Sequence, residues 1–186
     1  MWQSGDREYM NRNRPVLLVS ACLMGERVRY DGNDNAAKVG EIPLLHQYLQ
    51  QWHQEQRLVI ACPEQLGGMP TPRTPAEIVT SAGEMSGDDV LTNRTIVVTR
   101  AEENVSEFFQ AGAYRTLSLA KRYHVSAALL AEKSPSCGVD RIYNGDHNRT
   151  IVLGDGVTTA LLKQHDIKCF HPRQVDTLVR FMEKEL

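Results

Sequence analysis

The sequence predicts a single α/β domain of three layers, in which a mostly parallel, Rossmann-like sheet lies between two layers of helices. Short apolar runs rich in β-branched residues alternate with longer segments whose apolar residues recur at helical spacing, a pattern typical of parallel sheets. The 186 residues contain no internal repeat, low-complexity tract or linker, and this length suits one domain. We expect residues 1–14 to be a flexible N-terminus and residues 15–186 to form the domain.

Five short, mostly apolar runs are predicted to be strands, the first of them being "VLLVS" at 16–20. Runs of this length and composition are typical of strands buried on both faces of a sheet. In chain order the predicted strands are residues 16–20, 58–61, 95–99, 126–132 and 167–170.

The longer segments between these runs are predicted to be helices. In the first of them, Ile42, Leu45, Leu49 and Trp52 follow one another at intervals of three or four residues, which places them on one face of a helix. The predicted helices are residues 41–52, 102–123, 156–165 and 173–185. Residues 63–94 contain four prolines and little periodicity, so we expect a long loop there, of the kind that often carries a site.

The charge and the N-terminal composition exclude several classes of protein. The net charge of −2 lacks the basic excess typical of nucleic-acid-binding proteins, so we expect no DNA partner. The first fourteen residues are polar and unlike a signal peptide, and no apolar run reaches the roughly 18 residues of a membrane helix. These features favour a cytoplasmic protein, in which four cysteines are expected to be thiols or metal ligands rather than disulfides.

Three of the cysteines follow predicted strands. Cys22 comes after "VLLVSA", Cys62 after "LVIA" and Cys137 after "ALLAEKSPS". Because ligands bind at the C-terminal edge of open α/β sheets, these three thiols are predicted to converge there. Cys169 lies within "IKCF", and we interpret it as a buried core thiol.

Three thiolates can hold more than one kind of metal centre. Structural zinc usually takes four ligands in close pairs, and the chain has no C-x-x-C. A catalytic zinc with one open position fits three ligands, and so does an iron–sulfur cluster in which one iron has no protein ligand. The spacing of the cysteines does not choose between these two.

Polar residues in the same turns are candidates for acid–base chemistry. Glu64 follows Cys62 by two residues and Ser134 precedes Cys137 by three, and a carboxylate beside a metal can act as a general acid or base. The alternatives are a charge at the N-terminus of a helix for Glu64, and hydrogen bonding within the turn for Ser134 and Ser136.

Three further residues are candidates for substrate binding. Asp31 in "RYDG" could lie near the metal, although a turn-forming aspartate is the simpler interpretation. Arg73 in "TPRTP" and Arg29 beside Tyr30 could each contact one phosphate. The chain contains neither G-x-x-x-x-G-K-[ST] nor G-x-G-x-x-G.

Several longer motifs resemble a known family. "VSACLMGERVRYDG", "CPEQLGGMPTPRTPAEI", "EKSPSCG", "RIYNG" and "GDGVTTALL" are together similar to the thiouracil desulfurases, a family catalogued as DUF523, over residues 16–170. The resemblance implies a [4Fe–4S] cluster held by Cys22, Cys62 and Cys137, with one iron left open. It also implies Glu64 and Ser134 as the acid–base pair.

The reaction implied is the removal of sulfur from 2-thiouracil, 4-thiouracil or 4-thio-UMP without net redox chemistry, giving uracil or UMP and sulfide. Some relatives carry a further C-terminal domain and act on tRNA, whereas this chain ends near the desulfurase domain. We therefore expect a small thiolated pyrimidine or its nucleotide as substrate, with whole tRNA less favoured. The alternatives are a zinc hydrolase with three cysteine ligands that acts on a nucleobase, and a non-enzymatic iron–sulfur sensor or carrier.

Overall fold

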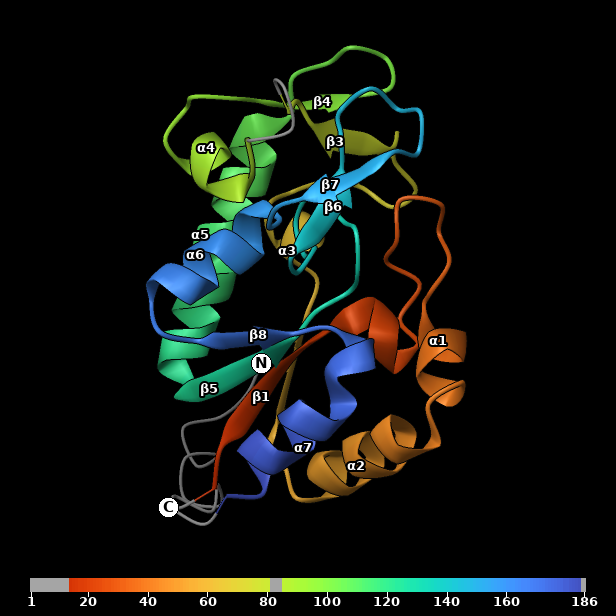
Figure 1. The fold of residues 1–186 in the computed structure, drawn as a ribbon, viewed down its shortest axis with the longest axis vertical. Coiled ribbons are helices and arrows are strands. Elements are labelled where there is room, and N and C mark those ends of the chain that lie inside the picture. Colours follow the sequence, from red (N-terminus) through yellow and green to blue (C-terminus); the bar gives the residue numbers. More distant parts are fainter. Residues whose placement is uncertain (1–13, 81–84, 185–186) are drawn as a thin grey trace.

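Four parallel strands form the central sheet of the computed structural model, which describes residues 14–80 and 85–184 (Figure 1). Their order is β2-β1-β5-β8, with all three pairings parallel. The strands are β1 (Val16–Ser20), β2 (Leu58–Ala61), β5 (Val125–Leu129) and β8 (Lys168–Phe170). Four of the five predicted strands therefore belong to the central sheet. The predicted flexible N-terminus lies, except for its last residue, outside the described residues.

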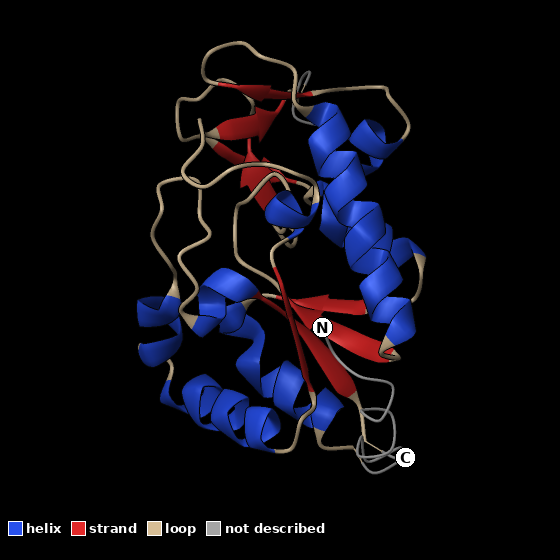
Figure 2. Cartoon of the chain, turned by 180° about the vertical axis from the view of Figure 1, so that it is seen from behind, coloured by secondary structure: helices blue, strands red, loops and turns tan. Residues whose placement is uncertain are grey.

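Helices cover both faces of this sheet, which confirms the three-layer α/β class (Figures 1 and 2). Helices α5 (Ser106–Arg122) and α6 (Val157–Gln164) pack together on one face, and α2 (Pro43–Gln54) and α7 (Val175–Met182) on the other. The fully buried Phe109 of α5 and Trp52 of α2 belong to the core on either side of β1. In the part of the chain that the structure describes, no helix has the length and apolarity needed to cross a membrane.

The predicted strand at 95–99 does not belong to the central sheet. Its residues form β4 (Val97–Thr99), which pairs antiparallel with β3 (Ala76–Ile78). A second antiparallel pair is formed by β6 (Arg141–Tyr143) and β7 (Ile151–Leu153). Strands of three residues are too short to show an alternating pattern, and the partners of a sheet edge are set by tertiary contacts.

The prediction of a long loop at 63–94 is wrong in part, because this segment contains three short elements. They are α3 (Pro63–Leu66), β3 and α4 (Gly87–Leu91). The short elements α1 (Ala36–Gly40), η1 (Ala21–Met24) and η3 (Pro172–Gln174) complete the chain. None of these helices spans more than five residues, so an apolar stripe cannot appear in the sequence.

The strand order places a crevice at the C-terminal ends of β1 and β5. From β1 the chain adds β2 toward one edge of the sheet, and from β5 it later adds β8 toward the opposite edge, so the direction in which strands are added reverses between β1 and β5. Ligands of doubly wound sheets bind where the direction reverses in this way. The two small antiparallel sheets lie beyond that edge, in the upper half of Figure 1.

Candidate metal and active site

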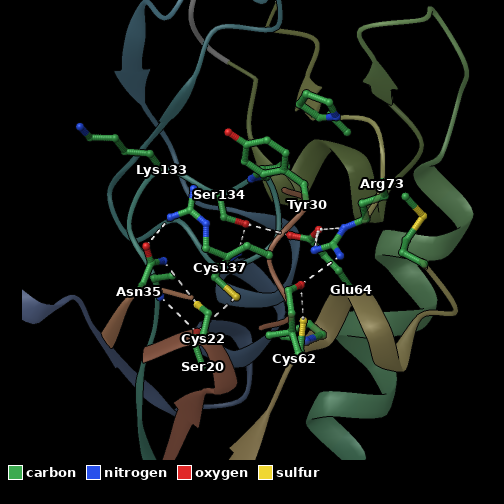
Figure 3. Close-up of a pocket in the computed structure, with 18 of the residues that line it drawn as sticks. Ser20, Cys22, Tyr30, Asn35, Cys62, Glu64, Arg73, Lys133, Ser134 and Cys137 are labelled. Carbon is green, nitrogen blue, oxygen red and sulfur yellow. Dashed lines mark hydrogen bonds and ion pairs between the residues drawn. The ribbon is translucent and has the colours of Figure 1, made fainter. Parts of the chain in front are cut away.

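A cavity of about 400 Å³ opens at this edge of the central sheet, and Cys22, Cys62 and Cys137 all line it. Cys22 lies in η1 directly after β1, Cys62 follows β2 and precedes α3, and Cys137 lies in the loop after β5. Figure 3 shows Asn35 on one side of these thiols, and Glu64 with Arg73 on the other. We call this space the thiol cavity. The structure thus brings together three cysteines that are far apart in the sequence.

Two of the thiols accept hydrogen bonds from neighbouring side chains. Asn35 donates its amide N–H to the Cys22 sulfur at 3.4 Å, and Ser20 donates its hydroxyl to the Cys137 sulfur at 3.5 Å. The Cys62 sulfur lies 4.0 Å from the carbonyl oxygen of Val28. Donors aimed at sulfur stabilise thiolates, and such contacts are typical of sulfur atoms that bind metals.

Burial raises the pKa of all three thiols, and that of Cys137 most strongly. The thiols also affect one another, because a charge on Cys62 raises the pKa of both Cys22 and Cys137. Three thiolates in one buried space therefore need a cationic group to compensate their charge.

The donor set fits an iron–sulfur cluster, since soft thiolates are the ligands that such clusters take. The described residues contain no group of three Cys, His, Asp or Glu side chains placed to hold a single metal ion. A single ion between three thiols is the arrangement that the zinc alternative requires.

The tight turn around Cys137 is built by Ser134 and by the start of α6. The Ser134 hydroxyl oxygen accepts hydrogen bonds from the backbone N–H groups of Ser136 (3.1 Å) and Cys137 (3.2 Å). A Cβ at Gly138 would lie 2.7 Å from the Ser134 carbonyl oxygen, and one at Gly156 would lie 2.4 Å from that of Ser136. Only glycine fits at these two close approaches, which hold the thiol against the cavity.

Glu64 is held in the cavity wall by an arginine and a serine. Arg73 donates its Nε to Glu64 Oε2 at 2.7 Å, and its Nη2 lies 2.5 Å from the same oxygen. Ser134 donates its hydroxyl to Glu64 Oε1 at 3.2 Å. The Arg73 side chain is only 5% exposed, and its Nη1 donates to the carbonyl oxygens of Val28 and Pro70. The guanidinium of Arg73 thus binds protein groups.

Helix α3, which carries Glu64, is fixed by close contact with α5. A Cβ at Gly67 would lie 2.0 Å from the Phe108 carbonyl oxygen, and one at Gly112 would lie 2.1 Å from that of Pro63. Two glycines therefore let the backbones of α3 and α5 touch. Because α5 also packs on the central sheet, the carboxylate of Glu64 is placed relative to the strands that carry the thiols.

The remaining predicted site residues have other surroundings. Arg29 lines the cavity but pairs with Asp31 at 3.3 Å and donates to Asn35. Asp31 accepts the backbone N–H of Asn33 at 3.1 Å, as a turn-forming aspartate does. The buried Ser136 hydroxyl shares a hydrogen bond of 2.9 Å with Thr158. Neither Asp31 nor Ser136 is among the described residues that line the thiol cavity.

The structure also adds residues that sequence reasoning missed. His147 and Glu77 line the cavity, with His147 Nδ1 3.6 Å from a Glu77 carboxylate oxygen. Glu77 accepts the backbone N–H groups of Gly145 and His147 and so fixes the loop between β6 and β7. His147 Nε2 is buried with no hydrogen-bond partner among the described residues. The sequence holds one signal for the loop that carries His147, the "NG" of "RIYNG", because this dipeptide is typical of hairpins.

Cys169 lies apart from the other thiols. It is half-buried rather than buried, because β8 is an edge strand, and it packs against the core with its sulfur 3.5 Å from the Ile167 carbonyl oxygen. Burial raises its pKa to about 12. It thus offers an unreactive thiol as a control for the other three.

Comparison with known proteins gives consistent results. A model of the 2-thiouracil desulfurase family matches residues 17–174. The chain is 39% identical over 164 residues to the uncharacterized protein YbbK of Bacillus subtilis (strain 168). The aligned region covers 88% of this chain and 100% of YbbK. It is also similar to the solved structure of the [4Fe-4S]-dependent thiouracil desulfidase TudS (DUF523Vcz). That likeness has a TM-score of 0.75 and 36% identity, and covers 90% of this chain and 97% of TudS.

Proposed function

The chain belongs to the 2-thiouracil desulfurase family, and from this premise we propose that it hydrolyses the C–S bond of a thiolated uracil with a [4Fe–4S] cluster. The observation that carries the proposal is the thiol cavity, in which three strand-end cysteines lie beside the pair formed by Glu64 and Ser134. TudS, which is similar over nearly the whole chain, is [4Fe-4S]-dependent. In this proposal Cys22, Cys62 and Cys137 bind the cluster and leave one iron open.

When bound, such a cluster would supply a Lewis-acidic iron suited to a soft thiocarbonyl sulfur. The chain itself would move the protons. Glu64 takes a proton from the water that attacks the ring carbon. It then passes this proton to Ser134, to which it is hydrogen-bonded, as the serine hydroxyl gives its own proton to the departing sulfur. Water and the thiocarbonyl give a carbonyl and hydrogen sulfide, so the reaction balances without an electron donor.

Arg73 has a supporting part in this scheme, because its two contacts with one Glu64 oxygen hold the carboxylate in place. The other Glu64 oxygen is thereby left for Ser134 and for water. This is a positioning role, since the Arg73 nitrogen atoms are directed at protein acceptors.

The direct test is an anaerobic assay of 2-thiouracil, 4-thiouracil and 4-thio-UMP side by side, with iron and released sulfide measured. We expect four irons per chain, as a [4Fe–4S] cluster requires, and sulfide from at least one substrate. Bound zinc with hydrolysis would support the zinc alternative. A cluster without turnover of any thiolated base would support the sensor or carrier.

The charges around the cavity favour a substrate with a phosphate. Six Lys and Arg side chains line it, of which Arg29 and Arg73 form ion pairs with Asp31 and Glu64. The other four lie on α1 and in the loops after β4, β5 and β6, and form no ion pair with another described residue: Lys38, Arg100, Lys133 and Arg149. The carboxylates that line the same cavity have partners, as Glu64 has Arg73. Because the whole chain has a net charge of −2, this local excess of positive charge would attract an anion.

We therefore expect a thiouridine monophosphate to bind better than the free base. Whole tRNA should be a poor substrate and DNA no partner, because phosphate contacts over a basic surface supply much of nucleic-acid affinity. A cytoplasmic location follows from the same proposal, since free thiols and thiolate-bound clusters persist in a reducing compartment.

The double variant Lys133→Ala/Arg149→Ala should raise the KM for 4-thio-UMP by about tenfold or more. A hydrogen bond to a charged group contributes about 1.5–3 kcal/mol, and 1.4 kcal/mol corresponds to a factor of ten. The KM for free 4-thiouracil should stay unchanged. Arg73→Ala is the matched control, and should lower kcat for both substrates alike. Equal KM changes for base and nucleotide would contradict a phosphate-binding role of Lys133 and Arg149.

A further inference from the structure

Asn35 is a buried polar residue whose side chain contacts a candidate ligand instead of capping its own helix. It precedes α1 at the N-cap position, where an asparagine usually accepts a backbone N–H of the first turn, yet it makes no such bond. Its backbone N–H donates to the Cys22 carbonyl oxygen at 2.8 Å, and its side-chain amide donates to the Cys22 sulfur at 3.4 Å. Asn35 therefore holds Cys22 at two points.

Arg29 fixes which way the Asn35 amide faces. Asparagine oxygen and nitrogen are interchangeable in shape, so a contact with sulfur alone leaves the orientation open. Arg29 can only donate hydrogen bonds, and its Nη1 contacts Asn35 Oδ1. The Asn35 Nδ2 must then face the Cys22 sulfur, as Figure 3 shows.

Asp31 in turn holds Arg29. Its two carboxylate oxygens lie 3.3 Å and 3.4 Å from Arg29 Nε and Nη2. Burial acts to raise the pKa of Asp31, but hydrogen bonds from Asn33 and the charge of Arg29 outweigh it and lower that pKa. The turn at 29–33 thus presents a charged pair that keeps the Asn35 amide in one orientation.

From these contacts we propose that Asn35, oriented by Arg29, is a positioning residue that tunes the metal centre through the sulfur of Cys22. The inference rests on the proposed [4Fe–4S] cluster. An N–H donor aimed at a ligand sulfur withdraws electron density from that thiolate, and therefore favours the reduced state and raises the reduction potential. The same withdrawal makes an open iron a better acceptor for the sulfur of the substrate.

The test is the reduction potential of the cluster in Asn35→Leu, which keeps the side-chain size and removes the donor. We expect a potential more negative than that of the wild type, at equal iron content. The kcat for desulfuration should fall by about tenfold, the lower end of the usual effect of removing such a partner. Gln54→Leu is the matched control, because Gln54 is an exposed amide at the end of α2 and does not line the thiol cavity, and it should keep the wild-type potential.

Arg29→Gln serves as a second variant if Asn35→Leu does not assemble the cluster. It leaves the Asn35 donor in place but removes the group that orients it, so the potential should shift in the same direction by a smaller amount. A wild-type potential in the cluster-loaded variants would overturn the inference and leave the proposed function intact. A wild-type chain that binds no cluster would overturn both.

Discussion

Replacing Cys22, Cys62 or Cys137 singly by alanine is expected to abolish both cluster binding and desulfuration. The three thiols line one cavity and come from three different strand ends. No other described cysteine lines this cavity, so none can replace a lost ligand. Two thiolates hold a four-iron cluster poorly against solvent. Iron and sulfide content after anaerobic reconstitution, with the visible absorption of the cluster, would measure the loss.

Cys169→Ala is the matched control for these variants. Its thiol lies on β8 outside the thiol cavity, and the exchange should cost about 1 kcal/mol of stability from lost packing. The variant should keep its full iron content and activity. Iron loss in this variant, or full iron content in any of the other three, would contradict the proposed ligand set.

Glu64→Gln is expected to keep the cluster and lose activity by about 10²–10⁴-fold, the usual contribution of a general acid or base. Glutamine has the same shape and can still accept hydrogen bonds from Arg73 through its one carbonyl oxygen, which leaves its amide NH2 facing Ser134. It cannot accept the proton of the attacking water. The measurement is kcat at saturating substrate, with iron content determined on the same sample, and near-normal turnover would leave Glu64 a structural role.

A comparison of two serine variants tests the partner of Glu64. Ser134→Ala removes the hydroxyl that faces Glu64, and should lower kcat. Ser136→Ala removes a hydroxyl that bonds Thr158 in the interior, and should lower the free energy of unfolding by about 1 kcal/mol with kcat unchanged. A larger kcat effect for Ser136→Ala would exchange the two assignments.

The sequence by itself determined the central layers of this protein. The apolar run at 16–20 is a fully buried strand, whereas the run at 58–61 is the edge strand β2, in which buried and half-buried residues alternate. Both were recognisable as strands from composition alone. The helical period of 102–123 marks α5 in the same way, because each of these signals is local. The position of Cys22 and Cys62 after two such strands then indicated a common edge, since parallel strands end on the same side of a sheet.

Only the tertiary structure decided which polar groups face one another at that edge. Asn35 lies in a polar stretch without periodicity, and its contact with Cys22 depends on how the loop after η1 folds back. Arg73 is nine residues from Glu64, and nothing local distinguishes an arginine that binds a carboxylate from one that binds a phosphate. In "SPS" the two hydroxyl groups have the same chemistry, and packing directs one at Glu64 and the other at Thr158. Hydrogen-bond partners of this kind are set by contacts distant in sequence, which no local pattern encodes.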